Sequence, residues 1–308
     1  MQQDARFRRI FRRVHAAHPG CLADEWLMQP CADARGQPVP RPIAWSRRNG
    51  PWRRHPLLFV GAAPGNAGGR GAGDLGAHAT RIPFGGDLAG ANLDVLLGSI
   101  GCSRNDTFLT AALNQLPGTG GGEPTLAELL APVGDYPTSV HLLRDTLIAV
   151  GPRLLVALGN VGARASFAAL ALADDATPRL PTLQRLERMG LRRGEPFPIA
   201  AASACFDDAF RVAWRDAWHE EPSFDVLLIT HPSGQNMSPF ARPETAFHLR
   251  MIDARDALRS AVAARLGTAL PDERPPLPDV GIYALPEWRE RIGPHHARLD
   301  ALWRMKGV

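Results

Sequence analysis

Four short, nearly continuous runs of apolar residues mark out the middle of the chain. They begin at residues 57, 107, 154 and 226, and each is followed within a few residues by Gly, Asn or Pro. Runs of this length that end in such residues are typical of strands buried on both faces of a sheet. Between and after them, apolar residues recur at helical spacing near 88–100, 138–149, 208–219 and 243–265. The alternation predicts a three-layer α/β/α sandwich around a four-stranded parallel sheet.

The rest of the pattern divides the chain into regions. We predict that residues 57–268 form the α/β domain, that 173–224 is an insertion within it, and that 269–308 is a C-terminal surface extension. Residues 1–56 comprise a basic amphipathic helix over 5–17 and an arm rich in Pro and Trp. The helix is either a peripheral element packed on the domain or one that faces DNA.

Composition narrows the class of protein. The chain has 308 residues, 45% hydrophobic and 21% charged, which is ordinary for a soluble globular protein. No apolar run approaches the roughly 20 residues of a membrane span, and the N-terminus lacks the core of a signal peptide. These features predict a cytoplasmic protein without a membrane segment.

Positive charge is concentrated near the N-terminus. The net charge is +4, but residues 1–56 carry 11 arginines against four acidic residues. Lys306 is the only lysine. Arginine is well suited to phosphate, because its planar fork can bind two oxygens at once. The pattern is compatible with a polyanionic partner, and a GC-rich genome explains the arginine bias equally well.

The cysteines do not indicate a disulfide scaffold. There are four of them, irregularly spaced: Cys21, Cys31, Cys102 and Cys205. Two of them form a series with histidines that has the residue types of a zinc site, namely His15, His18, Cys21 and Cys31. Because the spacing to Cys31 is long and unusual, we predict no metal and leave zinc as an open alternative.

Candidate chemistry lies where two of the predicted strands end. Gly61-Ala62-Ala63-Pro64-Gly65 follows the first run, and His231-Pro232-Ser233-Gly234 follows the fourth. Ligands of open α/β sheets bind beyond the carboxyl ends of the strands, so the site is expected there. The glycine-rich loop is not a P-loop, because Arg70 follows Gly69 where Lys and Ser or Thr are needed. Pro64 likewise argues against a dinucleotide-binding fingerprint.

Two further segments accompany these strand ends in the same order as in a known group of enzymes. They are Pro83-Phe84-Gly85-Gly86-Asp87-Leu88-Ala89-Gly90 and Arg153-Leu154-Leu155-Val156-Ala157-Leu158-Gly159. Together the four segments resemble the uracil-DNA glycosylase superfamily over about residues 57–170 and 225–265, most closely families 4 and 5. The resemblance implies a DNA glycosylase of base excision repair, which hydrolyses the N-glycosidic bond of uracil or a related deaminated base and which we expect to be a monomer.

The resemblance also implies roles for residues. His231 donates a hydrogen bond to the departing base, and Asp87 supplies the carboxylate near the sugar unless it only caps the following helix. Phe84 is either a stacking platform or a core residue. The remaining base-binding candidates are Gly61, Ala62, Ala63, Pro64, Gly65 and Asn114. The candidates for contact with DNA are Ser233, Gly234, Gln235 and Met237, of which Gln235 or Met237 would enter the duplex.

Several positions depart from families 4 and 5. Gln115 and Ser139 occupy positions where these families have cysteines that bind an iron–sulfur cluster, so we predict no cofactor. Ala62 replaces the glutamate of family 4, and the expected asparagine aligns nearest Ala111, three residues before Asn114. These departures keep open an alternative function, a catalytically weak member that binds DNA or a nucleobase without efficient cleavage.

Overall fold

The structure is a computed structural model. It describes residues 56–63, 84, 88–113, 123–173, 176–201, 206–238 and 241–271. Of the N-terminal part it describes residues 6, 9, 10 and 13 and the backbone of 28–32 and 38–42. The domain boundaries expected at residues 56 and 268 therefore stay predictions.

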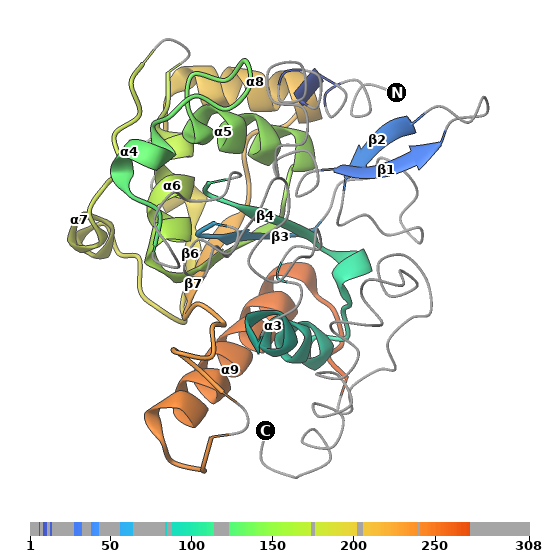
Figure 1. The fold of residues 1–308 in the computed structure, drawn as a ribbon, viewed down its shortest axis with the longest axis vertical. Helices are drawn as coiled ribbons and strands as arrows, with labels where there is room; N and C mark the ends of the chain where they lie inside the picture. The colour runs from blue at the N-terminus through green and yellow to red at the C-terminus, as the bar shows by residue number, and fades with distance from the viewer. Residues whose placement is uncertain are drawn as a thin grey trace.

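The four strands expected from the apolar runs form the centre of one sheet (Figure 1). They are β3 (Leu57–Gly61), β4 (Phe108–Ala111), β5 (Leu154–Leu158) and β7 (Asp225–Ile229). All their pairings are parallel, in the order β4-β3-β5-β7. Every residue of β3, β4 and β5 is buried, which explains why these strands show no alternation of apolar and polar residues.

A fifth strand corrects the prediction of a purely parallel, four-stranded sheet. β6 (Pro196–Pro198) pairs antiparallel with β7 at the edge of the sheet. It has only three residues, two of them proline, so its sequence carries no strand signal. Proline lacks a backbone N–H and is tolerated in a sheet mainly at an edge, which is where β6 lies.

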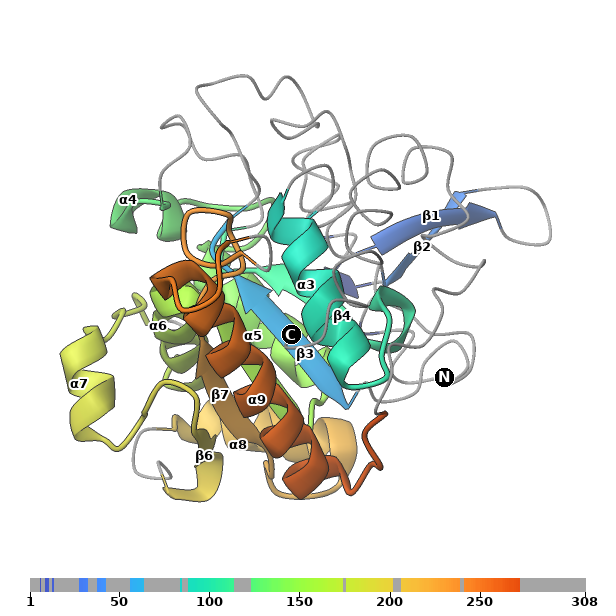
Figure 2. The same ribbon diagram turned by 90° about the horizontal axis from the view of Figure 1, so that it is seen from below.

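Helices cover both faces of the sheet, as Figures 1 and 2 show, and the predicted three-layer class is confirmed. α3 (Leu88–Ser99) and α9 (Ala246–Leu266) pack together on one face. α5 (Ser139–Val150), α6 (Gly159–Leu170) and α8 (Asp208–Trp218) lie on the other. Two short helices, α4 (Leu126–Leu129) and α7 (Leu183–Arg188), are peripheral. Among the described residues, no helix has the length and apolar character of a membrane span.

The segment 173–224, which we expect to be an insertion, packs against the rest of the domain. It contributes α7, β6 and α8, and the side chains of Phe210, Trp214 and Phe224 are fully buried. Trp214 stacks on Phe224 with ring centroids 5.4 Å apart. Helix α8 of this segment packs on α5. The polar and proline-containing sequence of 173–224 did not predict this contact.

Near the N-terminus, the described residues of the expected helix pack on the domain. Ile10 is buried, and the guanidinium of Arg13 lies 3.8 Å from the ring centroid of Tyr136. Arg13 also donates to Asp145 at 3.2 Å, and burial raises the pKa of that carboxyl. These contacts favour the peripheral packed helix over the one that faces DNA. Further along, β1 (Met28–Ala32) and β2 (Pro38–Pro42) pair antiparallel, and β2 lies within the arm rich in Pro and Trp.

Candidate active site

The carboxyl ends of β3, β5 and β7 bring together Gly61, Gly159 and His231. β5 lies between the other two strands, so a side chain after β5 would separate them. Gly159 has a φ of 81°, and a Cβ atom there would lie 3.1 Å from the Cβ of His231. The absence of a side chain at this position lets His231 lie close to the end of β5.

Phe84 completes this group. A Cβ atom on Gly61 would lie 2.6 Å from the Cζ atom of Phe84, so the ring packs directly against the backbone at the end of β3. The ring centroids of Phe84 and His231 are 6.0 Å apart, with an interplanar angle of 40°. Gly61, Phe84 and His231, predicted from segments far apart in the sequence, therefore form one cluster. Phe84 is largely buried, so it is a wall of the site and a core residue at once.

The tautomer of His231 follows from its backbone neighbour. The N–H of Ser233 donates to Nδ1 of His231 at 3.3 Å. In a neutral imidazole, the nitrogen that accepts carries no proton, so the proton is on Nε2. His231 is half-buried. In this tautomer, Nε2 is the hydrogen-bond donor of the ring.

Asn92 of α3 holds the loop that follows His231. Its Nδ2 donates to the carbonyl oxygens of Pro232 at 2.7 Å and Met237 at 3.0 Å, and the side chain is fully buried. A Cβ atom on Gly234 would lie 2.6 Å from Cδ2 of Leu88, so this loop packs tightly on the start of α3. Asn92 was not among the residues predicted for the site.

The structure corrects the prediction for Met237. This side chain is fully buried in the core, where it is not available to enter a DNA duplex. Gly234 and Gln235 are exposed, and Ser233 is half-buried with its Oγ accepting from Nδ2 of Asn236 at 2.9 Å. Of the two residues predicted to enter the DNA duplex, only Gln235 is exposed on the loop surface.

The loop after β3 is held by the end of β4. The N–H of Ala112 donates to the carbonyl of Gly61 at 2.9 Å, and the N–H of Leu113 donates to that of Ala62 at 3.0 Å. Ala62 and Ala63 are half-buried beside the cluster. Ala62 brings only a methyl group to the position where family 4 has a carboxylate.

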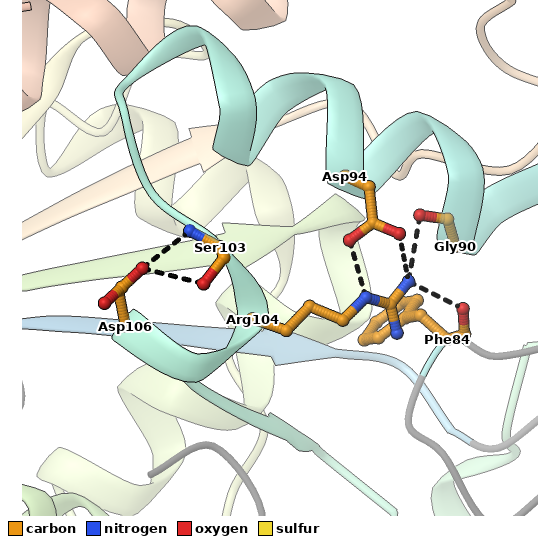
Figure 3. A network of polar contacts seen from close by, with 6 residues as sticks. All are labelled: Phe84, Gly90, Asp94, Ser103, Arg104 and Asp106. Carbon is orange, nitrogen blue, oxygen red and sulfur yellow. Dashed lines mark hydrogen bonds and ion pairs between the residues drawn. The ribbon is translucent and has the colours of Figure 1, made fainter. Parts of the chain in front are cut away.

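A buried ion pair lies behind Phe84 (Figure 3). Arg104 donates through Nε to Oδ1 of Asp94 at 2.6 Å and through Nη2 to Oδ2 at 3.0 Å. The same Nη2 donates to the carbonyl oxygens of Phe84 at 3.1 Å and Gly90 at 3.0 Å. Sequence reasoning missed both charged residues, because nothing in the local pattern distinguishes them from surface charges.

Beside His231 there is a cleft of about 540 Å³. Arg193, from the 173–224 segment, donates to Oδ1 of Asn160 at 2.8 Å, and Arg250 of α9 donates to the carbonyl of Asn236 at 3.3 Å. Burial lowers the pKa of Arg193, Glu187 acts against this, and Arg250 adds a smaller lowering effect. Glu123 and Asp253 also line the cleft, so it presents charges of both signs.

Other candidates lie outside the described residues. They are Pro64, Gly65, Asp87, Asn114 and Gln115, with His15, His18 and Cys21 of the alternative zinc series. Ser139 is described and is buried in the first turn of α5. In the parts of the chain that the structure covers, no group of three or more His, Cys, Asp and Glu side chains has the arrangement of a metal site.

Comparison with known proteins gives one family. The sequence model of the Uracil DNA glycosylase superfamily matches residues 49–255, about two thirds of the chain. The matched region runs from before β3 into α9 and contains Gly61, Phe84 and His231. No curated protein matches the chain.

Proposed function

Since this chain belongs to the uracil DNA glycosylase superfamily, we propose that it hydrolyses the N-glycosidic bond of uracil, or of a related deaminated base, in DNA. The observation that carries the proposal is the cluster of Gly61, Phe84 and His231, in which the hydrogen bond from the Ser233 N–H to Nδ1 makes Nε2 the donor of a neutral imidazole. Such a donor is suited to a leaving group that becomes negative as the bond breaks.

The reaction needs few groups. The bond between C1′ of the sugar and N1 of uracil breaks, its electron pair leaves with the base, and water adds to C1′ with loss of a proton. The sugar gains positive character and the base negative charge, so an enzyme gains most from contacts that strengthen in that state. Nε2–H of His231 would donate to a uracil oxygen, while Asp87 would take the proton of the water and stabilise the sugar. The base must first rotate out of the helix into the pocket.

The partner would be DNA. Gln235 is exposed on the loop that Asn92 fixes, and Arg193 and Arg250 line the cleft beside His231. Arginines in this position suit the phosphates that flank a flipped nucleotide. The acidic residues Glu123 and Asp253 in the same cleft limit this attraction.

Incubation with an oligonucleotide that contains a single uracil, followed by hot alkali, tests the proposal. Strand breaks at uracil are expected, because alkali cleaves the abasic site that excision leaves. Oligonucleotides with hypoxanthine, xanthine or hydroxymethyluracil at the same position identify the preferred base. Intact DNA after prolonged incubation with excess protein contradicts the proposal.

The alternative function is binding without efficient cleavage. Ala62 favours it, because its methyl group cannot position water as a carboxylate would. In that case, the uracil-containing oligonucleotide would be retarded in a gel but would not break in alkali.

We expect the purified protein to contain no stoichiometric iron. Gln115 and the buried Ser139 stand at two positions where families 4 and 5 have cluster cysteines, and neither side chain is a thiolate ligand. Iron analysis and the visible absorption spectrum of protein purified without oxygen check this. One cluster's worth of iron per chain would contradict the alignment at these two positions.

We expect Gln235→Gly to impair excision from duplex DNA far more than from single strands. The exposed Gln235 would fill the space that the flipped base leaves, and single strands have no such space to fill. The measurement is the ratio of single-turnover rates on the two substrates. Equal losses on both would mean that Gln235 is not a wedge.

A further inference from the structure

Phe84 has an unusual backbone conformation. Its φ is 54°, and among the described residues only His219 and Glu244 share a positive φ without being glycine. His219 ends α8, and Glu244 lies in a turn just before α9, so both occupy ordinary places for this conformation. Phe84 lies instead in the candidate active site. A bulky residue keeps such a conformation only where its surroundings hold it there.

Arg104 provides this hold. Its Nη2 donates to the carbonyl oxygen of Phe84 at 3.1 Å, and its two bonds to Asp94 orient the guanidinium (Figure 3). The side chains of Arg104 and Asp94 are 1% and 0% exposed. Because the guanidinium is planar and held by two bonds to one carboxylate, its orientation leaves little freedom to the carbonyl that it binds.

The backbone of Gly90 packs against the carbonyl oxygen of Phe84. A Cβ atom on Gly90 would lie 1.6 Å from that oxygen, so any side chain there would displace Phe84. The Gly90 carbonyl also accepts from Nη2 of Arg104 at 3.0 Å. The start of α3 and the side chain of Arg104 therefore both contact the carbonyl group of Phe84.

We infer that Arg104 and Asp94 are positioning residues, which fix the backbone of Phe84 so that its ring forms the wall of the base pocket between Gly61 and His231. Arg104 contacts the cluster at the carbonyl of Phe84, and Asp94 holds the guanidinium of Arg104. A purely structural ion pair is the competing explanation. However, burying an ion pair costs desolvation that its attraction often only balances, so fold stability alone is a weak reason for this arrangement. The inference rests on the proposed function and extends it to the geometry of the pocket.

Arg104→Lys tests the inference. Lysine keeps the charge, but one ammonium cannot reproduce the fork that joins Asp94 to the carbonyls of Phe84 and Gly90. We expect the single-turnover rate of uracil excision to fall by up to about 10²-fold, as small displacements in active sites do. Binding of a duplex with 2′-fluoro-2′-deoxyuridine, which resists cleavage, should change much less. Arg265→Lys is the matched control, because Arg265 lies 3.8 Å from Asp225 at the opposite end of β7 and should keep the wild-type rate.

A double-mutant cycle with Phe84→Ala separates positioning from stability. If Arg104 acts through the ring, Arg104→Lys should cause no further loss once the ring is gone. Gly90→Ala serves if Arg104→Lys does not fold, since it keeps both charged side chains, and its Cβ atom would lie 1.6 Å from the Phe84 carbonyl oxygen but 3.0 Å from Nη2 of Arg104. It should give a similar loss that also disappears in the Phe84→Ala background. Losses that multiply in the cycle, or a folded Gly90→Ala with the wild-type rate, would overturn the inference. A wild-type protein inactive on every deaminated base would instead contradict the proposed function.

Discussion

Replacing His231 with alanine is expected to slow the chemical step of uracil excision by about 10²–10³-fold, the usual cost of losing one well-placed donor to a developing negative charge. The Ser233 N–H occupies Nδ1, so the donor that disappears is Nε2–H. Because His231 is half-buried at the end of β7 and not in the core, the fold should survive. Single-turnover rates at saturating enzyme report the chemical step directly.

Two variants support the interpretation of that result. His231→Gln should recover part of the rate, since its amide can also donate from a similar position. His219→Asn is the matched control, because His219 ends α8 with a φ of 57°, which asparagine tolerates. A His231→Ala protein with the wild-type rate would show that the departing base is stabilised elsewhere.

Asp87→Asn should also slow excision by about 10²–10³-fold while leaving DNA binding nearly unchanged. Asparagine keeps the shape of the side chain but removes the charge that would position water and stabilise the sugar. Asp87 directly precedes α3, where asparagine caps a helix about as well as aspartate. The melting temperature should therefore hardly change, and loss of rate in a stable protein is the expected signature.

The capping explanation makes the opposite prediction. If Asp87 only caps α3, Asp87→Asn should excise at the wild-type rate, and Asp87→Ala should lower the melting temperature. Asp74, another acid in the same loop, would then be the next candidate for the carboxylate. Asp87→Ser adds a second test, since serine caps well but carries no charge.

The sheet was predictable because its central strands are buried on both faces. β3 and β5 consist almost entirely of apolar residues, and a glycine ends β3 and directly follows β5. The same logic failed for β6, where only Phe197 is buried between two exposed prolines. Three residues are too few to show an alternation of apolar and polar side chains. The pairing of β6 with β7 depends on tertiary contacts, which the local sequence does not reveal.

The site was predictable in part, for a different reason. Gly61 and His231 follow strands, and parallel strands bring their carboxyl ends to one edge, so sequence position was enough to place them together. Asp94 and Arg104 are ten residues apart with a helix end between them, and only the folded chain turns them toward each other. Met237 was misjudged because its loop folds back onto Asn92 of α3, a contact with no local signal.

The prolines of β6 have a consequence for self-association. The N–H of Ile199 donates to the carbonyl of Phe224 across the register of β6 and β7, and bonding alternates along an antiparallel pair. The nitrogens of Pro196 and Pro198 therefore point away from β7, toward the open side of the sheet. Neither carries a hydrogen, so a foreign strand that approached this side would find no donors at these positions. The edge of the sheet at β6 therefore disfavours hydrogen-bonded pairing with a strand of another molecule, which is the usual way in which exposed sheet edges associate.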